Sequence, residues 1–174
     1  MEIRALRPED DRSEFQSGDA DLDRFFRQFA GQNQFLHHIG VTYVAQEGGK
    51  ISGFATVSPG HVEIEDLPSG TRKKLPGYPL PILRLARLAV DRARQKASVG
   101  NRLLKFVLEM ATKMSEDFGC VGIIVDAKPD AVPFYARLGF LPLTPLEGQS
   151  DARPQPIPMF LPLRLVRESL KKEA

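Results

Sequence analysis

Two short segments of the chain carry residue types that could bind an anion and donate a proton. The first is the loop Arg94-Gln95-Lys96-Ala97-Ser98-Val99-Gly100-Asn101, between a predicted strand and a predicted long helix. A tight loop that leads into a helix leaves backbone N–H groups without partners, and these groups attract anions together with the helix dipole. The small Ser98 and the glycine at position 100 would let a phosphate approach the backbone closely.

The second segment is Phe134-Tyr135-Ala136-Arg137-Leu138-Gly139-Phe140. Two interpretations of it stay open on these residues alone. In the first, the Tyr135 hydroxyl is a proton donor in a catalytic site. In the second, Phe134 and Phe140 belong to the core and Tyr135 is a half-buried packing residue.

A strand–loop–helix–strand unit over residues 82–125 is predicted to position the loop. An apolar strand over 82–90 leads through a polar loop, 91–97, into a helix over 98–118 that Gly119 ends, and a buried strand follows over 121–125. A shorter helix over 130–138 then carries Tyr135 and stops at Gly139. Apolar residues at helical spacing give the long helix a buried stripe: Val99, Leu103, Leu104, Val107, Leu108, Ala111 and Met114.

The rest of the chain predicts further strands and one further helix. Strands are expected at 2–6, 41–45, 51–57, from Phe140, and at 159–165, with the glycines of Glu47-Gly48-Gly49-Lys50 forming a hairpin turn. The helix is expected over 22–35, and residues 59–81 are expected to form a proline-containing loop with a short element inside it. This order predicts an α/β (α+β) fold with a mixed sheet. An apolar helix face is formed by Leu22, Phe25, Phe26, Phe29 and Ala30.

Composition predicts a single globular domain over residues 1–174. Hydrophobic residues make up 42% of the 174 residues and charged residues 26%, which excludes a mainly disordered chain. The lone Cys120 is expected in the core, and with three histidines it forms no zinc framework, so no metal is expected. No segment approaches the roughly 18 apolar residues of a membrane helix. The first residues lack a signal-peptide pattern, so a cytoplasmic location without a membrane partner is expected.

Charge is unevenly distributed although the net charge is only +2. Residues 1–23 are acidic, whereas residues 84–105 carry seven basic side chains against Asp91 alone. A basic segment beside a site could attract an anionic ligand, or it could be the solvated face of a helix and its preceding loop. The candidates for substrate binding are Arg84, Arg87, Arg92 and Arg94. Because alternate strand residues face opposite ways, Arg84 and Arg87 would share a site only if the strand were bulged.

Together the two segments resemble the GNAT acetyltransferase superfamily, whose loop motif Q/R-x-x-G-x-G/A grips the pyrophosphate of acetyl-CoA. Gln95, Ser98 and Gly100 match that motif, and Phe134-Tyr135 with Gly139-Phe140 matches the segment that holds a tyrosine general acid. The resemblance implies the GNAT fold, a mostly antiparallel sheet flanked by helices, and makes Tyr135 catalytic. The acetyl-CoA contacts that it implies are Leu88, Ala89, Val90, Gln95, Lys96, Ala97, Ser98, Val99, Gly100, Asn101 and Phe134.

A narrower resemblance is to the GNAT toxins of bacterial toxin–antitoxin pairs. It implies acetylation of the amino group of aminoacyl-tRNA, arrest of translation and a ribbon-helix-helix antitoxin, and a homodimer is also considered. The four arginines above, with Arg137, would then meet tRNA or CoA phosphates. The matching residues are Phe15-x-Ser17-Gly18-x-x-x-Leu22-Asp23-x-Phe25, Thr42-Tyr43-Val44, Arg87 to Asp91, Val125-Asp126-Ala127, Phe134-Tyr135 and Met159 to Leu163.

The loop departs from the toxin pattern at two positions. Lys96 and Ser98 stand where the toxins usually have glycine. If such a position needs positive φ, a residue other than glycine costs about 1 kcal/mol or more. Two alternatives therefore stay open: a GNAT enzyme that acetylates a small amine or a protein amino group, and a protein that binds acyl-CoA without catalysis.

Overall fold

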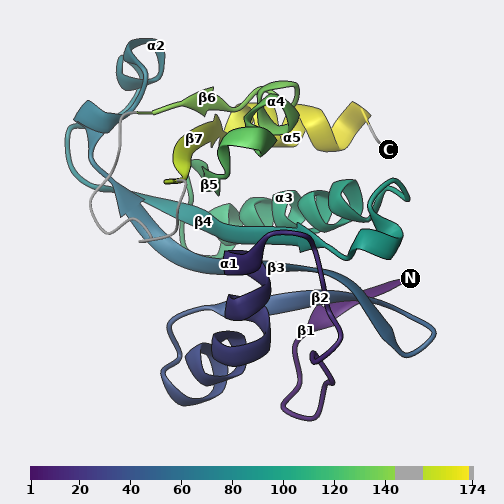
Figure 1. The fold of residues 1–174 in the computed structure, drawn as a ribbon. Helices are drawn as coiled ribbons and strands as arrows, with labels where there is room; N and C mark the ends of the chain where they lie inside the picture. Colours follow the sequence, from purple (N-terminus) through teal and green to yellow (C-terminus); the bar gives the residue numbers. More distant parts are fainter. Residues whose placement is uncertain (144–154, 173–174) are drawn as a thin grey trace. The chain divides into compact units, whose positions relative to one another are not determined.

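Seven strands form one sheet in the computed structural model, which describes residues 1–143 and 155–172 (Figure 1). The strands are β1 (Glu2–Ala5), β2 (Val41–Glu47), β3 (Lys50–Val62), β4 (Leu80–Val90), β5 (Gly122–Ala127), β6 (Leu141–Pro142) and β7 (Ile157–Pro162). They lie in the order β1-β2-β3-β4-β5-β7-β6. β4 pairs with β5 in parallel, whereas β1–β2, β2–β3, β5–β7 and β6–β7 are antiparallel. The prediction of a mixed, mostly antiparallel sheet is confirmed.

Five α-helices occur among the described residues. They are α1 (Ala20–Arg24), α2 (Ser69–Arg72), α3 (Val99–Asp117), α4 (Val132–Ala136) and α5 (Leu163–Lys172). Two π-helical turns, Phe25–Phe29 and Gln32–Leu36, continue α1, and 3-10 turns span Ile64–Asp66, Arg92–Arg94 and Pro129–Ala131. No helix in residues 1–143 or 155–172 is both long and apolar enough to span a bilayer.

The chain divides into two compact units whose residue ranges alternate along the sequence. Unit 1 holds residues 1–58 and 86–107, and unit 2 holds residues 59–85 and 108–174. β3, β4 and α3 therefore contribute residues to both units. The single domain over residues 1–174 stays a prediction.

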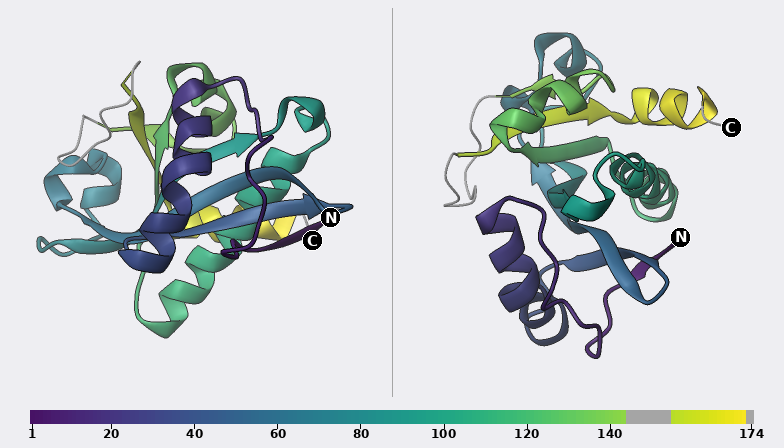
Figure 2. Two further views of the ribbon diagram at one scale, coloured as in Figure 1. Left: turned by 60° about the horizontal axis from the view of Figure 1, so that its bottom comes forward. Right: turned by 45° about the vertical axis from the view of Figure 1, so that its right-hand side comes forward.

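The core of unit 1 is built on phenylalanine rings. Phe26 stacks on Phe54 with ring centroids 4.4 Å apart, and Phe15 meets Phe26 edge-on at 4.9 Å. Val44 of β2 and Ala89 of β4 complete this buried cluster. Figure 2 shows the helical segment that begins with α1 lying across the strands of the same unit, where this cluster is formed. The apolar helix face predicted from the sequence therefore packs on β2 and β3.

Unit 1 contains a close approach of two strands and a helix at Gly53. A Cβ atom at Gly53 would lie 2.9 Å from the Ala89 carbonyl oxygen, 3.0 Å from Leu103 and 3.1 Å from Val99. Only a residue without a side chain lets β3 lie this near the end of β4 and the first turn of α3. Gly53 therefore sets the position of both elements that precede and follow the loop 91–98.

In unit 2, β5 packs between β4 and β7. Six residue pairs join β5 to β7, and Ile82, Ile124 and Phe160 are buried in one cluster. Cys120 is buried as predicted, and burial raises the pKa of its thiol. The last predicted strand, 159–165, is wrong beyond Pro162, because Leu163, Val166 and Leu170 recur at helical spacing and form α5 instead. Part of the proline-containing segment before β7, residues 144–154, lies outside the described residues.

The remaining predicted elements agree with the structure, with two exceptions. Residues 59–62, predicted to begin the proline-containing loop, continue β3 instead, because Val62 is buried against Leu80 and Ile82 of β4. All seven residues of the predicted α3 stripe are buried, and Gly48 and Gly49 have positive φ in the hairpin turn. The predicted helix over 22–35 is only partly α-helical, and Phe29, assigned to its buried face, is 43% exposed. The wider hydrogen-bond spacing of a π turn rotates Phe29 off the buried stripe, while Ala30 stays buried on it as predicted.

We predict that Gly53→Ala lowers the free energy of unfolding by about 1–3 kcal/mol, because the new methyl group would overpack a buried backbone contact. Urea denaturation measures the change. Gly70→Ala is the matched control, since a Cβ atom at Gly70 meets nothing within 4 Å and φ there is not positive. Equal stability of the two variants would contradict the role given to Gly53.

Candidate active site

The loop between β4 and α3 is fixed at its first residue by Asp91. The Asp91 N–H donates to the Ser52 carbonyl of β3 at 2.8 Å, which ties the end of β4 to the neighbouring strand. Its carboxylate accepts from the Ala93 N–H at 3.0 Å and from the Gln16 N–H at 3.1 Å. Asp91 thus caps the short turn that begins the loop.

Gln95 holds the middle of the loop. Its side-chain Nε2 donates to the Ser17 carbonyl at 2.7 Å and to the Val90 carbonyl at 3.1 Å. The resemblance placed Gln95 among the acetyl-CoA contacts. The structure instead places its amide N–H groups on two protein carbonyls, where they shape the loop around any ligand.

Ser98 has the backbone conformation that favours glycine. Its φ is +65°, and among the described residues other than glycine only His38 shares a positive φ. Lys96, the other departure from the toxin pattern, does not require this conformation. The left-handed region costs an L-residue roughly 1–2 kcal/mol, so the substitution at Ser98 introduces strain and the one at Lys96 does not.

The first turn of α3 presents backbone N–H groups beside Gly100, a position where the surrounding protein would leave room for a Cβ atom. The Arg102 N–H donates to the Ser98 carbonyl at 3.1 Å, so the earlier amides of the turn have no intrahelical partner. Val99 is buried and anchors the turn, while Asn101 is exposed. A Cβ atom at Gly100 would meet Val90 at an ordinary 3.6 Å. The free approach over Gly100 fits a phosphate group on these amides.

The end of β4 contributes Leu88, Ala89 and Val90 to the same unit as the loop. Ala89 is buried, and Leu88 and Val90 are half-buried, in keeping with the alternation of a strand. Lys96 and Ala97 are exposed in the loop. Unit 1 therefore brings together all of the predicted acetyl-CoA contacts except Phe134.

Three of the four arginines predicted to bind substrate are engaged inside the protein. Arg84 forms a two-pronged pair with Asp126 at 2.8 and 3.0 Å, and Arg94 forms an ion pair with Glu47. Arg87 lies over the Phe25 ring, 3.8 Å from its centroid.

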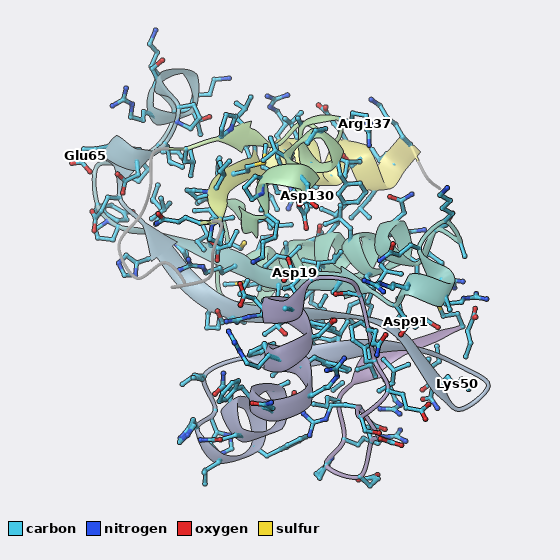
Figure 3. All side chains as sticks on the ribbon, in the orientation of Figure 1. Asp19, Lys50, Glu65, Asp91, Asp130 and Arg137 are labelled. Carbon is cyan, nitrogen blue, oxygen red and sulfur yellow. The ribbon has the colours of Figure 1, made fainter. Side chains whose placement is uncertain are left out.

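Arg92 and Arg137, by contrast, are exposed. The Arg92 guanidinium lies against Gly18. Figure 3 shows Arg137 at the surface of unit 2, and it shows Asp91 beside the loop in unit 1. Exposed cations of this kind are the ones whose charge can reach a phosphate.

Tyr135 lies in α4 and is held by a glycine-closed turn. Gly139 has φ +99°, and the Phe140 and Gly139 N–H groups donate to the carbonyls of Tyr135 and Ala136 at 3.2 and 3.1 Å. This is the Schellman arrangement that ends a helix at a glycine. The ring of Tyr135 meets Phe134 and Phe140 edge-on, at 5.1 and 5.4 Å. Tyr135, which one of the two sequence interpretations expected to be half-buried, is only 4% exposed.

Burial, and secondarily the negative charge of Asp126, raises the pKa of Tyr135 well above its usual value. The phenol therefore stays protonated at neutral pH, which is the form that a proton donor needs. Asp126 belongs to the Val125-Asp126-Ala127 match, but the sequence predicted no role for it. The feature that could have pointed to a role is that Asp126 is the single carboxylate near the end of an otherwise apolar strand.

Comparisons with known proteins bear on both parts of the site. The sequence matches the acetyltransferase (GNAT) domain family over residues 38–142. It is 32% identical over 138 residues to a tRNA-acetylating toxin of Mycobacterium tuberculosis, an alignment that covers 79% of this chain and 82% of that toxin.

Similar solved structures extend over almost the whole chain. One is AtaT complexed with acetyl-methionyl-tRNAfMet, with a TM-score of 0.79, 24% identity and coverage of 96% of this chain and 97% of that one. Another is an AtaT toxin with one tyrosine changed to phenylalanine, bound to acetyl-CoA and the C-terminus of the antitoxin AtaR. It has a TM-score of 0.74, 21% identity and 96% coverage of both chains. At these identities the likeness shows a common fold.

We predict that Ser98→Gly raises the free energy of unfolding by about 1 kcal/mol, because glycine relieves the left-handed strain and gives back part of that gain as backbone freedom in the unfolded chain. Urea denaturation measures the change. Ser69→Gly is the control, since Ser69 is an exposed helical serine without positive φ, and that variant should lose stability. If Ser98→Gly lowered the free energy of unfolding as much as Ser69→Gly, the backbone strain assigned to Ser98 would be contradicted.

Proposed function

Because the chain belongs to the GNAT acetyltransferase family, we propose that it acetylates the amino group of aminoacyl-tRNA and thereby blocks translation. The observation that carries the proposal is the 32% identity to a tRNA-acetylating toxin over 82% of that toxin's length. The loop before α3 and the buried Tyr135 are the parts of the structure that support it.

The fit of acetyl-CoA to this chain is supported by the geometry of unit 1. When bound, acetyl-CoA supplies an activated acetyl thioester. The N–H groups of residues 98–101 would hold its pyrophosphate, with room made by Gly100 and charge supplied by the helix terminus, whereas the Ala97 N–H already donates to the Arg94 carbonyl. The backbone of Leu88 to Val90 would hold the pantetheine arm and donate a hydrogen bond to the acetyl carbonyl. Phe134 is proposed as a further contact of the arm.

Tyr135 is proposed to supply the proton that the leaving sulfur needs. In the transfer, an N–C bond forms and the C–S bond breaks, while the amine gives up one proton and the sulfur gains one. A tyrosine hydroxyl is protonated at neutral pH, and burial, with the charge of Asp126, disfavours its phenolate further by raising the pKa of Tyr135. The α-amino group of an aminoacyl ester is less basic than a lysine side chain, so part of it is neutral without a dedicated base. The absence of a histidine from both motifs agrees with this scheme.

An aminoacyl-tRNA acceptor requires exposed cations near the loop. Arg92 keeps this proposed role because it is exposed at the start of the loop, and Lys96 and Arg102 are exposed beside it. Each of the other three arginines contacts a protein group. We therefore propose a positioning role, and no direct contact with the substrate, for Arg84, Arg87 and Arg94. A cytoplasmic location follows from the proposed substrate.

The partners of the chain are proposed from its relatives. The AtaT toxin has been solved with the C-terminus of its antitoxin AtaR. We propose that this chain is restrained by an antitoxin of the ribbon-helix-helix type, and the homodimer stays a prediction.

We predict that Gly100→Ala weakens CoA binding at least tenfold without lowering stability. A methyl group at Gly100 meets only ordinary contacts in the protein, and alanine is favoured over glycine in a helix by about 0.5–1 kcal/mol. Isothermal titration with CoA and thermal unfolding measure the two effects. Unchanged CoA affinity would place the pyrophosphate elsewhere, and Gly70→Ala controls for an added methyl group.

We predict that induction of the chain arrests bacterial growth and that Tyr135→Phe does not. The variant keeps the packing of the ring and removes only the hydroxyl, so its thermal unfolding should stay close to that of the wild type. Acetylated aminoacyl-tRNA, detected in the arrested cells by mass spectrometry of the 3′-terminal aminoacyl-adenosine, would identify the reaction. Normal growth with the wild type would reject the toxin function. CoA release over a panel of amines would then separate an enzyme of small amines from a protein that only binds acyl-CoA.

A further inference from the structure

A turn at residues 15–18 is joined to the loop at residues 91–98, the proposed acetyl-CoA loop, by contacts that the proposed reaction does not use. The Arg92 N–H donates to the Gln16 carbonyl at 2.8 Å, and the Gln16 N–H donates to Asp91 Oδ2 at 3.1 Å. The Ser17 carbonyl accepts from Gln95 Nε2 at 2.7 Å. These three hydrogen bonds join two segments that lie about 75 residues apart in the sequence.

Gly18 allows the same turn to lie flat against the loop. Its φ is +99°, and a Cβ atom there would lie 3.2 Å from Nε of Arg92. A side chain at Gly18 would therefore push the Arg92 guanidinium away. The turn and the loop are thus joined in unit 1 by one hydrogen bond between backbone groups and by two between a side chain and the backbone.

Asp23 holds the turn from the other side. Its side-chain Oδ1 accepts from the Ser17 N–H at 2.9 Å and from the Ser17 hydroxyl at 2.6 Å. Asp23 is only 6% exposed, and Arg27 is its nearest cation, at 3.9 Å. The Ser17 hydroxyl in turn accepts from the Asp19 N–H at 3.1 Å, which joins the turn to the capping residue of α1.

A buried carboxylate costs free energy unless hydrogen bonds satisfy it, so Asp23 adds little net stability compared with an apolar residue. It does define one conformation of residues 17–19, because its Oδ1 accepts from both the N–H and the hydroxyl of Ser17. The loop that this conformation supports contains the left-handed Ser98. Strained residues persist only where their surroundings determine the local conformation, and the turn supplies such surroundings for the loop.

We propose that Ser17 and Asp23 are positioning residues for acetyl-CoA. The carboxylate of Asp23 orients Ser17, the Ser17 carbonyl holds Gln95, and Gln95 keeps the loop in the shape that presents the first turn of α3. The proposal rests on the proposed function, because it assumes that the loop binds CoA. It gives a physical reason for the Ser-Gly and Leu-Asp residues that the sequence shares with the toxin branch.

Removal of the Ser17 hydroxyl tests this inference. We expect Ser17→Ala to raise the Kd for CoA about three- to tenfold, the effect of roughly one lost hydrogen bond. The acetylation rate at saturating acetyl-CoA should stay unchanged, so KM for acetyl-CoA rises while kcat does not. Ser17→Thr, which keeps a hydroxyl, should restore the wild-type Kd. In a Ser98→Gly background the loss should shrink to about twofold or less, because the two positions act on one loop and their effects are not additive.

Ser13→Ala is the matched control. The Ser13 hydroxyl also donates to a neighbouring aspartate, Asp11, at 2.6 Å, but Ser13 is exposed and its hydroxyl supports Asp11 rather than the turn at residues 15–18. A wild-type chain that does not bind CoA would reject the proposed function and this inference together. A wild-type chain that binds CoA, with Ser17→Ala binding equally well, would reject the inference alone. It would also be rejected if Ser17→Ala and Asp23→Asn lowered the unfolding temperature and the CoA affinity in parallel, with no rescue by Ser17→Thr or Ser98→Gly.

Discussion

The close approach of backbone at Gly53 is the constraint on which the position of the proposed acetyl-CoA loop depends. A single missing side chain lets the carbonyl of Ala89, the side chain of Val99 and the side chain of Leu103 converge on β3. These residues belong to the strand before the loop and to the helix after it. Because both ends of the loop are positioned on one point of β3, the loop has little freedom left in its length or direction.

Within that frame, the loop combines local strain with support from distant residues. Ser98 occupies a conformation that L-residues disfavour, and Asp91 and Gln95 donate or accept hydrogen bonds that hold the residues before it. Two of these supports lead to the turn at residues 16–17 rather than to the strands. A loop of this kind does not depend on glycine for its shape, because long-range hydrogen bonds perform part of the work that backbone flexibility performs in a glycine-rich loop.

The proposed proton donor, Tyr135, depends on a different physical effect. Tyr135 is enclosed by Phe134 and Phe140, and the enclosing apolar surface disfavours the charged phenolate. Asp126 adds a repulsive negative charge, and Arg84 compensates part of that charge by its two hydrogen bonds. The arginine that the sequence offered as a substrate contact is thus part of the electrostatic surroundings of the proposed acid.

The sequence by itself determined the features that arise from local periodicity and local turn chemistry. The stripe of α3, the glycines of the β2–β3 hairpin and the glycine that ends the helix of Tyr135 could all be predicted, since each depends on residues within a few positions. The tertiary structure alone decided the partners of charged and polar groups. In each case the partner lies far away along the chain: Asp126 is 42 residues from Arg84, Phe25 is 62 from Arg87, Glu47 is 47 from Arg94 and Ser17 is 78 from Gln95. No local pattern encodes a contact over such distances, because only the folded chain brings the two partners together.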